Sequence, residues 1–168
     1  MEVLQAITGR RSVRKFKNEP VPDEHLRIML DAAMHCPSAC NRRPYEFYVI
    51  KNEAVKEKIS AISPNWRMLK NAGAVIVVCG RLDLEEGMHS FWQQDCSAAT
   101  QNILLAAYSL GYGACWCGCH PVTEREEGVS EALDLMESTV PLSVIAVGVA
   151  DEAPAEKGFY DETRVTFI

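Results

Sequence analysis

The order of hydrophobic and polar positions along the 168-residue chain predicts helices and strands in alternation. Asp23 and Glu24 stand where the first turn of a helix favours negative charge, and apolar residues follow at helical spacing until Pro37. This pattern predicts an amphipathic helix of about three turns. Helical patterns also cover residues 2–8, 53–62, about 65–72, about 91–110 and about 123–133.

Runs of strand length separate these helices, at residues 44–51, 74–80, 114–120 and 141–149. The run AVIVVCG at 74–80 is unbroken, as expected where helices cover both faces of a sheet. Helices in alternation with hydrophobic strands predict an α/β or α+β sandwich, in which helices flank a central sheet.

The longest helical pattern, FWQQDCSAATQNILLAAYSL, is small or apolar over much of its circumference. That breadth predicts burial on more than one side, with a subunit interface as one way to achieve it. Gly111 and Gly113 are expected to end this helix, and Gly9 to cap the helix over 2–8.

Composition predicts one globular domain over residues 1–168, because 48% of the residues are hydrophobic and no linker or repeat divides the chain. No apolar run approaches the roughly 18 residues that a membrane span needs. The N-terminus places apolar residues before basic ones, the reverse of a secretory signal. Seven cysteines without regular spacing indicate free thiols in a reducing compartment, so we expect a cytoplasmic protein.

The formal net charge of -6 argues against nucleic-acid binding, because an acidic protein repels a polyanion. Only GRRSVRKFK, at residues 9–17, is locally basic. Such a short cluster suits a small anion, although a solvated charged turn is the plainer alternative.

The segment ACWCGCHP raises the possibility of a metal site, because it carries Cys115, Cys117 and Cys119. Two thiolates on one zinc ion lie about 3.8 Å apart. Alternate side chains of a strand are separated by about 6.6 Å. We therefore predict no metal site, even with Cys36 and Cys40 available, and expect the three strand cysteines to be small buried residues. Cys115 and Cys117 can also touch a bound ligand without reacting.

Four segments together, in their order and spacing, resemble the nitroreductase family of FMN-dependent oxidoreductases along almost the whole chain. They are GRRSVRKF at 9–16, CPSACNRRPYEFYVI at 36–50, QNILLAAYSLGYGACW at 101–116 and PLSVIAVGVADEAPAEK at 141–157. The resemblance implies an α+β fold, a nitroreductase-like α/β sandwich whose central sheet is mainly antiparallel. It also implies an intertwined homodimer with two sites at the interface.

The activity that the resemblance implies is a ping-pong oxidoreductase reaction. NAD(P)H gives a hydride to flavin N5, and a nitroaromatic, a quinone or a similar small-molecule electron acceptor then takes the electrons. No catalytic side chain is expected, because FMN carries the chemistry. Two alternatives stay open: a specialised family reaction, either flavin fragmentation or reductive dehalogenation, and a more distant non-enzymatic metal- or nucleic-acid-binding module.

The basic segment supplies the first cofactor-binding residues that the resemblance implies. Guanidinium groups offer planar donors for phosphate and carbonyl oxygens, and a serine hydroxyl can donate to phosphate or ribityl oxygens. We expect Arg10 and Ser12 at the phosphate or ribityl group and Arg14 at the ring, while the direction of Arg11 stays open.

A second group matches residues that the family contributes from the other subunit. These are Pro37, Ser38 and Asn41, and the plainer alternative for the first two is a helix stop. The Asn41 amide, which both donates and accepts, suits the N3 and O4 edge of a flavin. The chain departs from the family at Arg43, where glutamine is common, and at Tyr45, where tryptophan is common, which leaves substrate preference in doubt.

The remaining expected contacts lie on the strand over 114–120 and in the tail. Trp116, Cys117 and Gly118 match a segment whose backbone amides approach flavin N5 and O4, and a glycine allows close backbone approach. Core packing is the alternative for Trp116. Lys157 and Arg164 are candidates for the phosphate, with a solvated tail as the alternative for Arg164.

Overall fold

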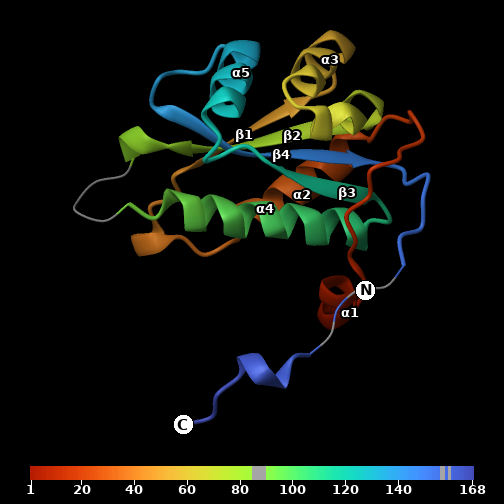
Figure 1. Ribbon diagram of the computed structural model, residues 1–168, viewed down its shortest axis with the longest axis vertical. Coiled ribbons are helices and arrows are strands. Elements are labelled where there is room, and N and C mark those ends of the chain that lie inside the picture. Colours follow the sequence, from red (N-terminus) through yellow and green to blue (C-terminus); the bar gives the residue numbers. More distant parts are fainter. Residues whose placement is uncertain (85–89, 156–157, 159) are drawn as a thin grey trace.

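A four-stranded sheet lies at the centre of the protein, in a computed structural model that describes residues 1–84, 90–155, 158 and 160–168 (Figure 1). The strand order is β1-β2-β4-β3, and every neighbouring pair is antiparallel. This arrangement is the mainly antiparallel α+β sandwich that the resemblance implies. The strands are β1 (Tyr45–Ile50), β2 (Ala74–Arg81), β3 (Gly113–Gly118) and β4 (Thr139–Gly148).

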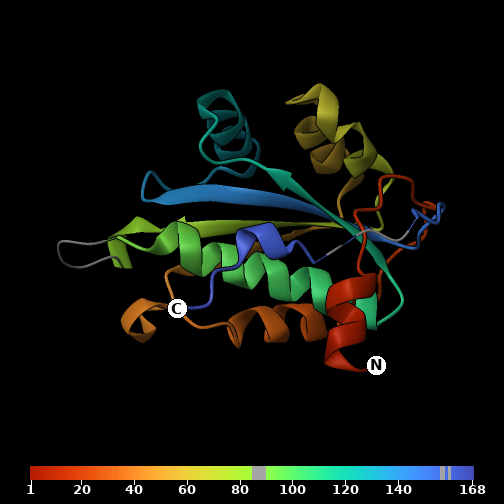
Figure 2. The ribbon, with the colours of Figure 1, turned by 60° about the horizontal axis from the view of Figure 1, so that its bottom comes forward.

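Helices cover both faces of the sheet, and the views in Figures 1 and 2 agree on the two layers. One face carries α2 (Asp23–Met34) and α4 (Trp92–Ser109). The other carries α3 (Glu53–Ala61), the 3₁₀ helix η2 (Pro64–Asn71) and α5 (Thr123–Leu133). The short elements are α1 (Val3–Gly9), η1 (Ala39–Asn41), η3 (Leu82–Leu84) and η4 (Glu162–Arg164).

The sequence of β2 is an unbroken apolar run because both faces of this strand are buried. Successive side chains of a strand point to opposite faces, so alternate residues enter different cores. The residues from 74 to 79 are all fully buried, which confirms the expectation that helices cover both faces. Ala74, Ile76 and Val78 belong to the core beneath α2 and α4, and Val75, Val77 and Cys79 to the core beneath α3 and α5.

The long helix α4 ends as the glycines predict. Gly111 has a φ of 85°, in the left-handed region that favours glycine. The Tyr112 amide donates to the Ala107 carbonyl at 2.9 Å, which closes a Schellman motif. The chain therefore reverses at Gly111 and leads directly into β3.

The strand expected over 114–120 is shorter than predicted and ends at Gly118. The amides of Cys119 and His120 both donate to the Leu142 carbonyl, at 3.0 and 3.1 Å, so the chain leaves the ladder there. All seven cysteines are free, and Cys115, Cys117 and Cys119 are buried as expected.

The described part of the chain holds no candidate for a membrane-spanning helix or for a metal centre. None of its helices is long and apolar enough to cross a bilayer. Within the same residues, no cluster of three or more His, Cys, Asp or Glu side chains is placed to hold a metal ion.

Candidate functional site

The basic segment runs in extended form beside the edge strand β3. The Val13 amide donates to the Ala114 carbonyl, and the Lys17 amide donates to the Val149 carbonyl, both at 3.0 Å. These bonds tie the segment to the first residues of β3 and to the end of β4. The basic segment is therefore fixed along a sheet edge.

The segment begins where α1 passes close to α4. A Cβ atom on Gly9 would collide with the Tyr108 hydroxyl, so a larger residue there would have to displace the Tyr108 side chain. Gly9 is the last helical residue and Arg10 occupies the C-cap, one residue later than predicted. The close approach places Arg10 beside the C-terminal part of α4.

The side chains of Arg10 and Arg11 each carry a hydrogen-bond donor without a partner. Among the described residues, Arg10 Nε and Arg11 Nη1 are buried without a hydrogen-bond partner. Both residues line a cavity of about 450 Å³, together with Leu104 and Tyr108 of α4. Because an unpaired buried donor is costly, these atoms fit an anionic ligand that accepts hydrogen bonds.

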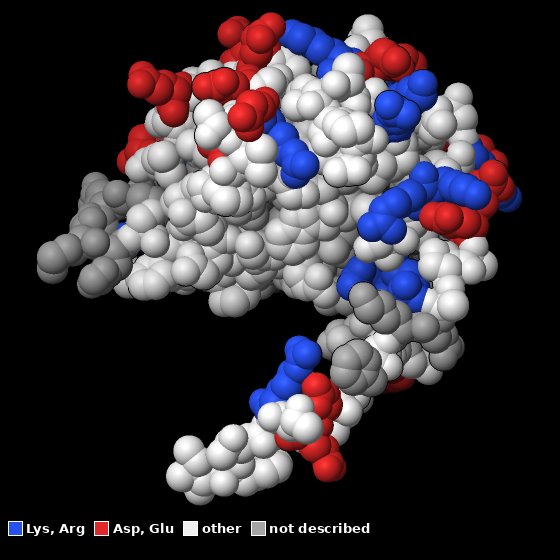
Figure 3. Space-filling model, in the orientation of Figure 1, with Lys and Arg blue, Asp and Glu red and all other residues white. Residues whose placement is uncertain are grey.

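Figure 3 shows Lys and Arg gathered on the side of the body where this segment runs, whereas acidic residues crowd the region of α5.

The next residues of the segment face the thiols of β3. A hydrogen bond with the Cys117 thiol is the largest of the effects that lower the pKa of Cys115. The charges of Arg14 and Arg10 and a hydrogen bond with Ser12 lower this pKa further, while burial opposes them. The structure therefore brings together the basic segment and β3, two groups that the sequence predicted separately.

The pairing of β3 decides which of its backbone amides point outward. Residues alternate along an antiparallel strand between facing their partner strand and facing away from it. The bond from Cys119 to Leu142 and the outward carbonyl of Ala114 fix this alternation. The amides of Trp116 and Gly118 thus point to the open edge of the sheet, and the Cys117 amide points to β4.

The side chains at this edge leave room for a ligand. Nothing lies within 4 Å of the position that a Cβ atom would take on Gly118. The Trp116 side chain is exposed, with 36% of its surface accessible, so in this chain it is not a core residue. The Cys117 side chain, between these two residues, is 5% exposed and packs into the core.

The second predicted group lies at the other edge of the sheet. Pro37, Ser38 and Asn41 precede β1, whereas the basic segment adjoins β3. Three strand spacings separate these edges, which is about 14 Å. One chain therefore does not gather both groups.

The loop that carries the second group has an unusual backbone. Cys40, Asn41 and Arg43 have φ angles of 51°, 55° and 53°, although none is glycine. A left-handed conformation costs a non-glycine residue roughly 1 kcal/mol. The Ser38 hydroxyl accepts from the Arg43 amide at 3.1 Å, and Arg43 Nε donates to Asn41 Oδ1 at 2.9 Å.

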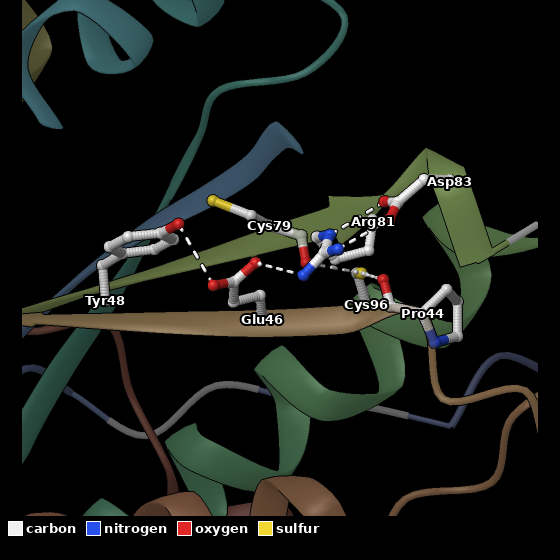
Figure 4. A network of polar contacts seen from close by, with 7 residues as sticks. All are labelled: Pro44, Glu46, Tyr48, Cys79, Arg81, Asp83 and Cys96. Carbon is white, nitrogen blue, oxygen red and sulfur yellow. Dashed lines mark hydrogen bonds and ion pairs between the residues drawn. The ribbon is translucent and has the colours of Figure 1, made fainter. Parts of the chain in front are cut away.

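A polar network adjoins the point where this loop enters β1 (Figure 4). Arg81 pairs with Glu46 at 3.2 Å and with Asp83 at 2.6 Å, and Tyr48 donates to Glu46 at 3.2 Å. Neighbouring strands β1 and β2 contribute Glu46 and Arg81. The network therefore holds the ends of β1 and β2 together next to the loop.

Of the two predicted tail residues, the structure describes only Arg164, which lies apart from the basic segment. Arg164 lies on η4, in a tail that extends away from the sheet and helices (Figure 1). Its guanidinium pairs with Asp161 at 2.9 Å, and its side chain is 79% exposed. Lys157 lies outside the described residues.

Sequence reasoning missed two acidic residues beside the candidate site. The Glu152 carboxylate accepts from the backbone amides of Arg14 and Lys15, the first at 2.5 Å and the second at 3.2 Å. The Asp95 carboxylate accepts from the Ala39 amide of the loop before β1. Asp95 is the one acidic residue in an otherwise small, polar or apolar helix, and that isolation was a readable signal.

Comparisons with known proteins point to one family. The family model described as "Nitroreductase family" matches residues 7–66 and 63–149. A protein of Methanothermobacter thermautotrophicus, named "Putative NADH dehydrogenase/NAD(P)H nitroreductase", is 44% identical over 165 residues, which are 98% of this chain and 86% of that protein.

Solved structures agree with this match. A crystal structure of a protein with the same name from Parabacteroides distasonis has a TM-score of 0.93 and 37% identity, over 98% of this chain and 96% of the other. An FMN-dependent nitroreductase from Clostridium difficile R20291 has a TM-score of 0.90 and 26% identity, over 98% of both chains.

Proposed function

Because the chain belongs to the nitroreductase family, we propose that it is an FMN- and NAD(P)H-dependent oxidoreductase. Its acceptor is a nitroaromatic, a quinone or a similar small molecule. When bound, FMN supplies the hydride chemistry at its N5 atom, so the chain needs no acid or base of its own. The residues of the chain bind and orient the two reactants.

The observation that carries this proposal is the pair of unpartnered guanidinium atoms, Arg10 Nε and Arg11 Nη1. A phosphate dianion beside them would satisfy both donors with charge-assisted hydrogen bonds. The Ser12 hydroxyl, next along the segment, would donate to phosphate or ribityl oxygens. The chain would thus hold the phosphate end of FMN beside the cavity of about 450 Å³.

The edge of β3 suits the ring end of the cofactor. The outward amides of Trp116 and Gly118 are donors for acceptor atoms such as N5 and O4. Arg14 adds a positive charge beside this edge, which favours the reduced and more negative form of a flavin. The open space above Gly118 lets a planar ring approach the backbone.

A second copy of the chain completes the site. It supplies Pro37, Ser38 and Asn41, which one chain keeps at the opposite sheet edge. The exposed apolar end of the tail, where Phe167 is 91% exposed, is consistent with cover by a second chain. Lys157 and Arg164 remain candidates for the phosphate, and a reducing cytoplasm remains the proposed location.

Anaerobic spectroscopy tests the reaction in two separate steps. NADH or NADPH added to the FMN-loaded protein is expected to bleach the flavin absorbance band. A quinone or a nitroaromatic, added after the oxidised nicotinamide has been removed, is expected to restore it, as a ping-pong cycle requires. A band that neither nicotinamide bleaches would overturn the choice of donor.

A further inference from the structure

A buried carboxylate reaches from α4 to the backbone of the loop formed by residues 36–44. The Asp95 side chain is 5% exposed, and its two oxygens lie 3.1 and 3.2 Å from the Ala39 amide, from which they accept. Burial of a carboxylate is costly unless hydrogen bonds compensate for lost hydration. The hydrogen bonds with the Ala39 amide, in the middle of the 36–44 loop, contribute to this compensation.

The two ends of the 36–44 loop are tied independently. The Cys36 thiol donates to the Asp95 backbone carbonyl at 3.7 Å, and the Arg81 amide donates to the Pro44 carbonyl at 2.7 Å. Figure 4 shows the Cys96 thiol directed at Pro44, at 3.9 Å. The ends are therefore fixed by α4 and β2, and the Asp95 carboxylate fixes the segment between them.

That segment needs an outside contact because its backbone is strained. Cys40 and Asn41 follow Ala39 directly, and both adopt left-handed conformations, as does Arg43. Strained residues persist where the surrounding structure over-determines them. The contact between Asp95 and Ala39 lies immediately before these residues.

The strained turn orients one amide group. Arg43 Nε donates to the Asn41 side chain, and a guanidinium has donors only, so the oxygen of the Asn41 amide must face Arg43. The NH₂ group of Asn41 is then turned away from Arg43, as a donor for a ligand.

We propose that Asp95 is a positioning residue, which holds the 36–44 loop in the form that presents the Asn41 amide to the cofactor. The inference rests on the proposed function, in which this loop lies against FMN held by a second chain. Asp95 touches neither cofactor nor substrate, and acts through Ala39. When the Asp95 carboxylate is removed, the Ala39 amide loses its acceptor and the left-handed turn relaxes.

Three variants and one matched control test this role. Asp95→Ala removes the acceptor, and Asp95→Asn keeps an amide oxygen that can still accept from Ala39. Ala39→Pro removes the donor from the loop side and leaves α4 intact; the extended Ser38, with ψ of 150°, tolerates a following proline. The control is Asn102→Ala, because Asn102 donates from the same helix to the Ala32 carbonyl of α2, at 2.8 Å.

Two measurements are made on the full chain. Hydrogen exchange of the loop amides is followed without FMN, and the FMN dissociation constant is measured by quenching of flavin fluorescence. We expect Asp95→Ala to speed loop exchange and to weaken FMN binding, each by at least about tenfold, as loss of a charge-assisted bond implies. Ala39→Pro is expected to weaken FMN binding similarly, and Asp95→Asn to recover most of the wild-type affinity.

The control separates positioning from general stability. Asn102→Ala is expected to lower the unfolding midpoint but to leave loop exchange and FMN affinity near wild type. Equal effects of Asp95→Ala and Asn102→Ala on the loop would overturn the inference, as would an open loop that binds FMN normally. Wild-type protein that binds no FMN would overturn the proposed function instead. Loop exchange, which is measured without FMN, would still test the contact between Asp95 and the loop.

Discussion

The Cys119 thiol is a buried group whose protonation depends on folding. Burial raises its pKa to about 12, and the Glu126 carboxylate acts in the same direction against the charge of Arg125. An unfolded chain exposes this thiol, with a pKa of about 8.5. The folded pKa is the higher one, so the stabilisation is complete below about pH 8.5 and is lost as the pH rises toward 12.

Alkaline unfolding measures this contribution directly. The free energy of unfolding of the wild-type protein is expected to fall between pH 8 and 10.5, with Cys119 adding up to about 1.4 kcal/mol per pH unit above its unfolded pKa. Cys119→Ala should show a shallower fall in urea titrations across this range. Cys40→Ala, which removes an exposed thiol, is the control, and identical slopes for all three proteins would refute the assignment.

The sequence alone supports the proposed site residues to different degrees. Arg10, Arg11 and Ser12 stand in one short motif, so sequence order alone predicts that they act together. The isolation of Asp95 in its helix was a signal, but its contact with the Ala39 amide was not predictable, because the two residues are 56 positions apart and no motif records such a contact. The sequence also could not decide which amides near Trp116 point outward, since that depends on the pairing of β3 with β4.

Among the elements, β3 is the one whose edge we propose as the site of the flavin ring, and Gly118 tests this proposal. Gly118→Ala is expected to change the free energy of unfolding by less than about 0.5 kcal/mol, because a Cβ atom there meets nothing within 4 Å. The same methyl group would occupy the space proposed for the flavin ring. FMN affinity, measured by equilibrium titration, should therefore fall by about tenfold or more.

Gly148→Ala provides the contrast at the end of β4. A Cβ atom there would lie 2.8 Å from the Gly73 backbone nitrogen, so backbone must move and stability should fall by about 1–3 kcal/mol. A Gly118→Ala protein that binds FMN like wild type would show that this edge is not the ring site. A destabilised Gly118→Ala protein would contradict the open space at Gly118.

Element boundaries show where sequence patterns fail. The helices begin and end within about two residues of their predicted limits, because capping glycines and apolar spacing are local signals. The strand over 114–120 was predicted too long, since the alternation of Cys115, Cys117 and Cys119 continues past the last ladder residue. The chain leaves the sheet there through a hydrogen bond with Leu142, a contact that the local pattern cannot reveal.

At the scale of the whole molecule, the sandwich was predictable and the strand order was not. Alternating apolar strands imply a covered sheet, but the order β1-β2-β4-β3 depends on contacts between distant segments. That order is what keeps Asn41 and Arg10 at opposite edges. The proposed site therefore needs two copies of the chain, so that the loop of one copy can meet the basic segment of the other.

Sedimentation velocity, recorded at a protein wavelength and in the flavin band, tests this claim most directly. Both signals are expected to move together, in a particle of twice the 18.7 kDa chain mass, with one FMN per chain. A flavin band that stays behind while the protein sediments would contradict FMN binding. An 18.7 kDa particle that carries its full complement of FMN would contradict the shared site.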